Sequence, residues 1–302
     1  MPDYGRDLLF GVFITPVAQP PQQAVELAVA AETAGLDLAA FQDHPYQPRF
    51  LDTWTLLSYA AARTTRIRLL PDVLNLPLRQ PVVVARSAAS LDLLSGGRLE
   101  LGLGTGAFWD AIVAAGGERL SPGDAVTGLE DAIRIIRGIW DAGATAPLRV
   151  DGKIHQVHGA KRGPAPAHDV GVWLGAYKPR MLRLTGAAAD GWLPSLGYLR
   201  GGPPDLAALN AVIDDGAASA GRNPASVRRL LNISGSFGPA NRGLLQGPPG
   251  QWVRELADMA LQYGISGFIL ASDDAAEITR FGAEVAPEVR AMVEAARTAS
   301  LR

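Results

Sequence analysis

Residues 66–106 read RIRLLPDVLNLPLRQPVVVARSAASLDLLSGGRLELGLGTG and contain one complete strand–helix–strand repeat. The apolar runs Ile67–Leu74 and Arg98–Leu103 are short and nearly continuous, which predicts strands buried on both faces, as in a parallel sheet. Between them, Pro81–Leu94 begins with proline and stops before Gly96-Gly97, the start and stop pattern of a helix. The segment therefore indicates an α/β protein of alternating strands and helices.

The same alternation runs through the rest of the chain. Further strands are predicted at Leu8–Ile14, Leu36–Gln42, Val170–Ala176, Gly191–Ser195, Leu230–Phe237 and Gly267–Ser272. Further helices are predicted at Gln22–Ala34, Asp52–Arg63, Asp124–Asp141, Pro179–Ala189, Asp205–Ala220, Gln251–Tyr263 and Ala275–Ala296. Eight strands, each followed by a helix, predict a (β/α)8 TIM barrel, although an open doubly wound sheet would give a similar alternation.

Two long segments are expected to be loops of this barrel. No compositional linker divides the chain, so residues 1–302 are predicted to form a single TIM-barrel domain with loop insertions at its C-terminal mouth. The segment Ala142–Asp169 is rich in Gly, Pro and Ala and is expected to be an irregular insertion over a barrel end. Gly238–Gly250 is also rich in Gly and Pro and is expected to be a mobile lid.

Composition excludes several classes of protein. The 302-residue chain is 48% hydrophobic and 19% charged, with a net charge of −2 and no cysteine. A globular fold is therefore expected, without disulfides, thiolate catalysis or a basic nucleic-acid surface. The N-terminus lacks a signal-peptide pattern, and the chain lacks a charge-free apolar run long enough to span a membrane. We expect a cytoplasmic protein.

The most informative candidate site follows the predicted strand Leu36–Gln42, which ends in Asp43 and His44 before Pro45. Active sites of (β/α)8 barrels lie at the carboxyl ends of the strands, so both side chains are placed for chemistry rather than for packing. Histidine is the side chain that titrates near neutral pH, and a neighbouring carboxylate can fix its tautomer. His44 is therefore the candidate general acid or base, with Asp43 as the group that orients it.

Two other strand ends carry ligand-binding patterns. Gly102, Gly104 and Ala107 match the dinucleotide pattern GxGxxA, but the strand is the fourth in the chain, so we do not interpret them in this way. Glycines here would instead let backbone N–H groups approach a flat ring or a phosphate. The segment LGAYKPR, residues 174–180, ends a strand and starts a helix, so with Lys178 it is a candidate anion site.

Four segments of the chain, in this order and at this spacing, are similar to segments of a known protein family. They are AAETAGLDLAAFQDH at 30–44, the segment 66–106, VGVWLGAYKPRMLRLTGAAADGW at 170–192 and FGAEVAPEVR at 281–290. Through them the chain resembles, nearly end to end, the bacterial-luciferase-like family of flavin- or deazaflavin-dependent oxidoreductases. The resemblance implies a TIM barrel that holds a flavin-type ring at its C-terminal mouth. It also implies a non-prolyl cis peptide after the third strand, here Asp72-Val73.

The resemblance also implies roles for particular residues. His44, with Asp43 beside it, would be the catalytic pair next to the reactive ring atom. The implied cofactor-binding residues are Asp72, Val73, Asn75, Gly104, Thr105, Gly106, Asp110, Gly175, Ala176, Tyr177, Lys178 and, as a weaker phosphate candidate, Arg280. Phe108 and Trp109 are expected to wall an apolar substrate pocket. No metal site is expected, because the surroundings of His155 and His158 are rich in Gly and Pro.

The implied cofactor is coenzyme F420, because QDHPYQPRFLDTW at residues 42–54 is more similar to the F420-dependent branch of the family. An FMN-dependent two-component monooxygenase is the alternative, since FMN members use a histidine at the same strand end. A barrel that binds a flavin without turnover is a further alternative. The expected partners are a small-molecule substrate, a separate flavin or F420 reductase and a second copy of the chain.

One departure from the family narrows the substrate. The F420-dependent sugar-phosphate dehydrogenases of the family carry a Glu directly after GTG and a Trp a few residues beyond the histidine. This chain has Ala107 after Gly106, and Pro48 and Arg49 beyond His44. Oxidation of a sugar phosphate is therefore not expected, and the neighbouring aromatic residues favour a more apolar substrate.

Overall fold

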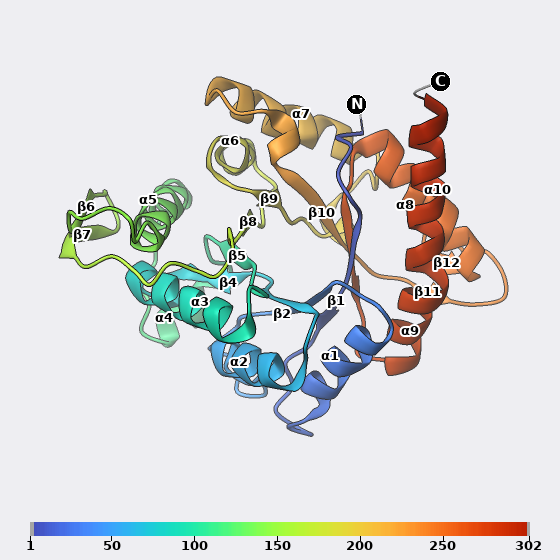
Figure 1. The fold of residues 1–302 in the computed structure, drawn as a ribbon, viewed down its shortest axis with the longest axis horizontal. Coiled ribbons are helices and arrows are strands. Elements are labelled where there is room, and N and C mark those ends of the chain that lie inside the picture. The colour runs from blue at the N-terminus through green and yellow to red at the C-terminus, as the bar shows by residue number, and fades with distance from the viewer. Residues whose placement is uncertain (1–2, 301–302) are drawn as a thin grey trace.

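The predicted alternation is present in the computed structural model, which describes residues 3–300 (Figure 1). One parallel sheet has the order β3-β2-β1-β13-β10-β9-β8-β5-β4. Its strands are β1 Leu9–Ile14, β2 Leu38–Phe41, β3 Arg68–Pro71, β4 Leu74–Asn75, β5 Leu101–Gly104, β8 Val172–Leu174, β9 Gly191–Trp192, β10 Arg228–Ile233 and β13 Gly267–Ala271. β3 and β4 follow each other directly and fill one strand position, so the barrel has the eight positions that the sequence predicts.

The sheet closes on itself between its two ends. Leu69 in β3 pairs in parallel with Leu99, just before β5, and the backbone N–H of Glu100 donates to the carbonyl of Leu69 at 3.0 Å. Closure leaves no open edge among these strands, and it rules out the doubly wound alternative. The expectation of a (β/α)8 barrel is confirmed.

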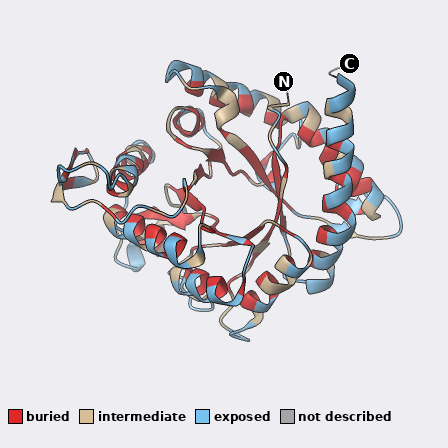
Figure 2. Ribbon diagram, in the orientation of Figure 1, coloured by how far each residue is buried: buried red, intermediate tan, exposed pale blue. Residues whose placement is uncertain are grey.

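The helices form a ring outside the strands and bury their inward faces (Figures 1 and 2). They are α1 Gln23–Thr33, α2 Thr53–Arg63, α3 Pro81–Ser95, α4 Trp109–Ala114, α5 Pro122–Trp140, α6 Pro179–Ala188, α7 Asp205–Ser219, α8 Pro249–Tyr263, α9 Ala275–Arg280 and α10 Ala286–Ser300. The side chain of Asp52 accepts from the Thr55 N–H at the start of α2, and left-handed Gly96 ends α3. Within residues 3–300, none of these helices combines the length and hydropathy of a membrane span.

The core has two layers because side chains alternate along each strand. One buried cluster gathers side chains from strand positions all round the sheet, which places it inside the barrel: Leu38, Ala40, Leu70, Trp173, Leu193, Leu230 and Ile269. The next residues along β2, Ala39 and Phe41, belong instead to the larger cluster between strands and helices. The inner layer supports the end of the barrel where the strands terminate in polar residues.

Four predicted elements differ from the structure. The predicted strand Leu230–Phe237 ends at Ile233, and its last two residues form β11 Ser236–Phe237, which pairs with β12 Gln246–Gly247 in a separate two-stranded sheet. The strand Ile67–Leu74 is interrupted at Asp72-Val73, and the helix Ala275–Ala296 is divided by a π-turn over Phe281–Val285. The segment 142–169 is not irregular, because β6 Leu148–Asp151 and β7 Gln156–Ala160 form an antiparallel hairpin.

This hairpin also lies elsewhere than expected. The buried Asp131 carboxylate of α5 accepts the backbone N–H of Ile154 at 2.9 Å and of His155 at 3.2 Å. The hairpin therefore packs along the outside of α5 rather than over a barrel end (Figure 1). The strand β6, with sequence LRVD, does alternate apolar and polar residues, but it is only four residues long and lies in a segment rich in Gly and Pro, which favoured the prediction of a loop.

Candidate active site

A cavity of about 550 Å³ opens at the carboxyl ends of the barrel strands. Its lining comes from the strand ends and the loops that follow them: Phe13, Gln42, Asp43, His44, Tyr46, Asp72, Val73, Leu74, Asn75, Gly104, Thr105, Gly106, Ala107, Phe108, Gly175, Tyr177, Leu193, Ser195, Tyr198 and Asn232. Eleven of these are residues for which the sequence predicted a site role: Asp43, His44, Asp72, Val73, Asn75, Gly104, Thr105, Gly106, Phe108, Gly175 and Tyr177. The volume suits a small organic molecule or a flat ring system.

His44 lies at one side of the cavity, beyond the apolar end of β2. Its Nδ1 is 2.7 Å from the hydroxyl oxygen of Tyr46. The rings of Phe50 and Phe108 also face it, with the Phe108 ring edge-on at a centroid distance of 5.6 Å. Burial among these rings lowers the pKa of His44, and the charge of Asp43 partly opposes that shift. His44 is therefore largely neutral at neutral pH.

Asp43 does not orient His44, contrary to the expectation from sequence. Its buried carboxylate accepts from the guanidinium of Arg79 at 2.8 and 3.1 Å and from the backbone N–H of Asn75 at 2.9 Å. Arg79 also donates to Asp52 at 2.9 Å. The two carboxylates raise the pKa of Arg79, although burial alone would lower it. Asp43 therefore fixes the loop after β4 and acts on His44 only through its charge.

The floor of the cavity contains the expected non-prolyl cis peptide, Asp72-Val73. Burial raises the pKa of the Asp72 carboxyl to about 7, and Asn232 opposes this shift by hydrogen bonding. Within the described residues, Oδ2 of Asp72 and Oδ1 of Asn232 are buried without a hydrogen-bond partner. Buried oxygens of this kind are normally satisfied, so both point to a ligand that donates hydrogen bonds.

Two glycines, Gly104 and Gly175, lie against the side chain of Val73 in this floor. A Cβ on Gly104 would lie 2.6 Å from Cγ2 of Val73, and a Cβ on Gly175 would meet both methyl groups of Val73 at 3.6 Å. The side chain of Val73 therefore fills the space beside the two glycines. The backbone of Phe108 is left-handed, with φ of 51°. Its ring is 65% exposed on its outer side and covers His44 with its edge.

Five residues predicted for the site do not line this cavity: Trp109, Asp110, Ala176, Lys178 and Arg280. Trp109 starts α4 instead of extending a loop, and Asp110 is exposed and pairs with Arg119. Lys178 is exposed at the N-terminus of α6, beside the cavity wall at Tyr177. Arg280 pairs with Glu284 at 3.4 Å and lies over the ring of Phe237.

Three site residues were missed from the sequence: Tyr46, Arg79 and Tyr198. Tyr46 could have been found, because it stands two residues after His44 in a turn that contains Pro45. Arg79 and Tyr198 come from remote segments and carried no local signal. The expected lid 238–250 does not line the cavity, and no three His, Asp or Glu side chains within residues 3–300 form a metal-binding cluster.

The closed barrel and the histidine at the end of β2 define a TIM-barrel protein with an acid–base group at its mouth. Within that class, the chain belongs to the luciferase-like monooxygenase family, whose sequence profile matches residues 8–240. The resemblance seen in the sequence is therefore confirmed.

Two relatives with similar sequences and one solved structure with a similar fold illustrate this family membership. The F420-dependent glucose-6-phosphate dehydrogenase of Mycolicibacterium gilvum is 31% identical over 229 residues, 72% of this chain and 65% of that enzyme. The 5,10-methylenetetrahydromethanopterin reductase of Methanolobus tindarius is 33% identical over 222 residues, 73% of this chain and 63% of the reductase. The chain thus spans slightly less than two thirds of these relatives.

The solved structure is an F420-dependent secondary alcohol dehydrogenase in complex with an F420–acetone adduct. It superposes with a TM-score of 0.82 and 18% identity, over 94% of this chain and 99% of the other. This likeness confirms the fold.

Proposed function

We propose that this protein is an F420-dependent oxidoreductase that transfers a hydride to or from a small organic substrate. The observation that carries the proposal is His44, which uses Nδ1 for Tyr46 and keeps Nε2 for a ligand in the cavity. An acid–base group facing a cavity of this size can exchange a proton with a substrate oxygen or nitrogen. The F420-dependent relatives support the choice of cofactor.

The residues present fit a deazaflavin ring. Gly104 and Gly175 make room for the Val73 side chain in the cavity floor, and the buried oxygens of Asp72 and Asn232 lack partners within the described part of the chain. When bound, F420 would supply a ring that accepts or donates a hydride. Asn75, Thr105, Gly106 and Tyr177 would complete its cradle.

The phosphate end of the cofactor would leave the cavity toward the start of α6. The free N–H groups of that helix start and the exposed Lys178 attract anions. Arg280 is a weaker candidate, because it lies near Phe237 and away from the cavity. Ala176, after β8, and Asp110, in α4, do not line the cavity and would contribute through their backbone.

The substrate would lie between the ring and the side chains near His44. Phe108 covers this space and Ala107 adds no charge, which favours an apolar alcohol, imine or activated alkene over a sugar phosphate. Trp109 would act from behind Phe108, at the first turn of α4.

Parallel titrations with F420 and FMN, followed by cofactor fluorescence, test the proposal. Binding of F420 alone is the expected result; binding of FMN alone would support a two-component monooxygenase, and binding of neither would refute the flavin-type assignment. His44→Gln should retain F420 affinity and lose about 10²- to 10⁴-fold in turnover. Unchanged turnover would remove His44 from the chemistry, and a wild type that binds without turnover would support the non-catalytic barrel.

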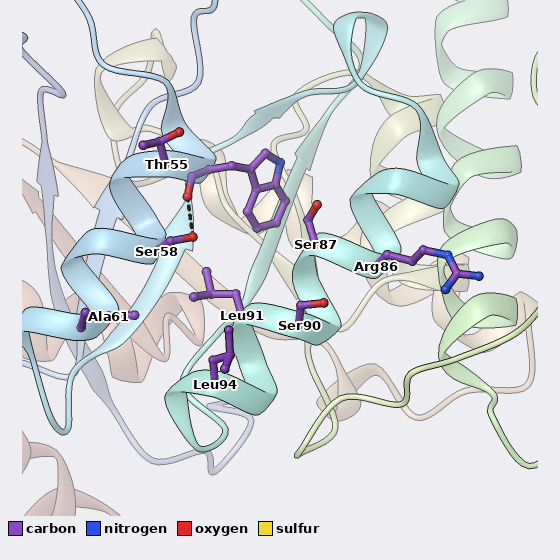
Figure 3. Close-up of a pocket in the computed structure, with 10 residues that line it drawn as sticks. Thr55, Ser58, Ala61, Arg86, Ser87, Ser90, Leu91 and Leu94 are labelled. Carbon is purple, nitrogen blue, oxygen red and sulfur yellow. Dashed lines mark hydrogen bonds between the residues drawn. The ribbon is translucent and has the colours of Figure 1, made fainter.

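We further propose that the chain is a single domain and forms a homodimer. A hollow of about 690 Å³ lies outside the barrel between α2 and α3, where Leu91 and Leu94 face small Ser and Ala residues (Figure 3). Leu94, which lines this hollow, is 87% exposed, and a second copy of the chain seated there would bury it. A cytoplasmic location and a separate F420 or flavin reductase remain predictions.

A further inference from the structure

Tyr46 is held against His44 by a turn. The backbone N–H of Gln47 donates to the carbonyl of His44 at 2.8 Å, and Pro45 occupies the second position of this turn, which its fixed φ favours. The turn brings the Tyr46 ring to a centroid distance of 5.5 Å from the imidazole. The resulting contact of 2.7 Å between the hydroxyl oxygen and Nδ1 has ideal length for a hydrogen bond to nitrogen.

The direction of this hydrogen bond follows from its length and from the two groups that share it. The distance of 2.7 Å is short for a bond donated by a ring N–H and typical of one donated by a hydroxyl group. A phenol is also a stronger acid than the N–H of a neutral imidazole, and the unprotonated ring nitrogen is a good acceptor. The Tyr46 proton therefore points to Nδ1 of His44.

Asp43 fixes the neighbouring loop and not the imidazole. Its carboxylate accepts the backbone N–H of Asn75 at 2.9 Å and is itself paired with Arg79, which also binds Asp52. The groups that face His44 from other segments, Phe50 and Phe108, are apolar and cannot compete for Nδ1. Tyr46 is therefore the described side chain that determines which imidazole nitrogen carries the proton.

We propose that Tyr46 is a positioning residue that holds neutral His44 as the Nε2–H tautomer, so that the resting site presents a proton donor to a carbonyl or imine substrate. This inference rests on the proposed function and deepens it, because it assigns the reductive direction and an acceptor class to the same site.

The proposed step balances. When bound, reduced F420 would supply the hydride for the new C–H bond, and the substrate oxygen would take both carbonyl π electrons and the proton from Nε2. As that N–H bond breaks, the Tyr46 proton moves to Nδ1, so the imidazole stays neutral as the other tautomer. After the product leaves, Nε2 takes a proton from water and Nδ1 returns its proton to Tyr46, which restores the resting tautomer. The net change is one hydride and one proton added to the substrate.

Nitrogen-15 NMR of the ligand-free protein tests the tautomer without any cofactor. The four histidines are distinguished with His44→Gln, which removes one set of signals. We expect wild-type His44 to carry its proton on Nε2, and Tyr46→Phe to show both tautomers. The pKa of His44 should rise in Tyr46→Phe, because the neutral imidazole loses a donor. Tyr59→Phe, which removes an exposed hydroxyl outside the cavity, is the matched control.

Two results would overturn the inference. One is a wild-type His44 protonated on Nδ1, and the other is a Tyr46→Phe spectrum and His44 pKa that match wild type. If F420 binds, Tyr46→Phe should also lower kcat for reduction about tenfold with little change in KM, since the lost interaction acts in the proton-transfer step. If F420 does not bind, the proposed function fails, while the NMR result still decides the role of Tyr46.

Discussion

Asp72 is a buried carboxyl group whose protonation depends on its surroundings in the cavity floor. Its carboxyl is buried beneath the mouth, and burial raises its pKa to about 7. A carboxyl group of this kind is half protonated at neutral pH, so it can either donate or accept a hydrogen bond. The Asp72 carboxyl group would therefore be able to pair with a ligand atom whether that atom carries a proton or not.

Asp72→Asn should stabilise the ligand-free protein, and the gain should depend on pH. In the unfolded chain the carboxyl loses its proton near pH 3.8, whereas in the folded protein it keeps the proton up to about 7. The free energy of unfolding of wild type therefore falls as the pH rises through this window and is then constant. The variant lacks this fall, so its advantage should grow from pH 4 to 7, toward an upper limit of about 4 kcal/mol.

Urea unfolding at pH 4.5, 6 and 8 measures this difference. Asp110→Asn is the control, because its side chain is 99% exposed in the ion pair with Arg119. An Asp72→Asn advantage that is equal at all three pH values would show that the substitution acts through packing and not through the buried charge.

At the scale of elements, β5 depends on glycine where it passes β3. A Cβ on Gly102 would lie 2.1 Å from the carbonyl oxygen of Pro71, which is a backbone atom that cannot rotate away. Gly102→Ala should therefore cost about 3 kcal/mol or more and lower the yield of folded protein. Gly197→Ala is the control, since nothing lies within 4 Å of its Cβ position. Thermal unfolding that finds the two variants equally stable would contradict this account of the strand contact.

The same scale shows what sequence could and could not predict. The strand β13 is a continuous apolar run and the helix α5 has strong periodicity, so the existence of both was predictable. The six-residue α4 and the β6–β7 hairpin have too few buried positions for a pattern. His44 was predictable from its strand end, but Arg79 was not, because its contact with Asp43 spans 36 residues.

At the scale of the whole molecule, the hollow between α2 and α3 is the surface through which we expect the proposed homodimer to form. Leu94→Glu places a charge on the lining of this hollow and should convert the proposed dimer to a monomer while leaving the barrel folded. Sedimentation velocity measures the change, with Met292→Glu on the exposed face of α10 as the control. A wild type that sediments as a monomer would refute the dimer, and an unaffected dimer would place its interface elsewhere.

Phe108 and the short helix α4 that follows it are packed less firmly against the barrel than the rest of the cavity lining. The floor consists of strand ends tied into the barrel core, whereas α4 buries only Ile112 and its cover residue Phe108 stands 65% exposed. Substitutions in residues 107–111 can therefore accumulate without disturbing the fold, and a change at Phe108 also alters how deeply His44 is buried. During divergence, such a protein can exchange its substrates by changing this cover while it inherits its chemistry unchanged from the floor.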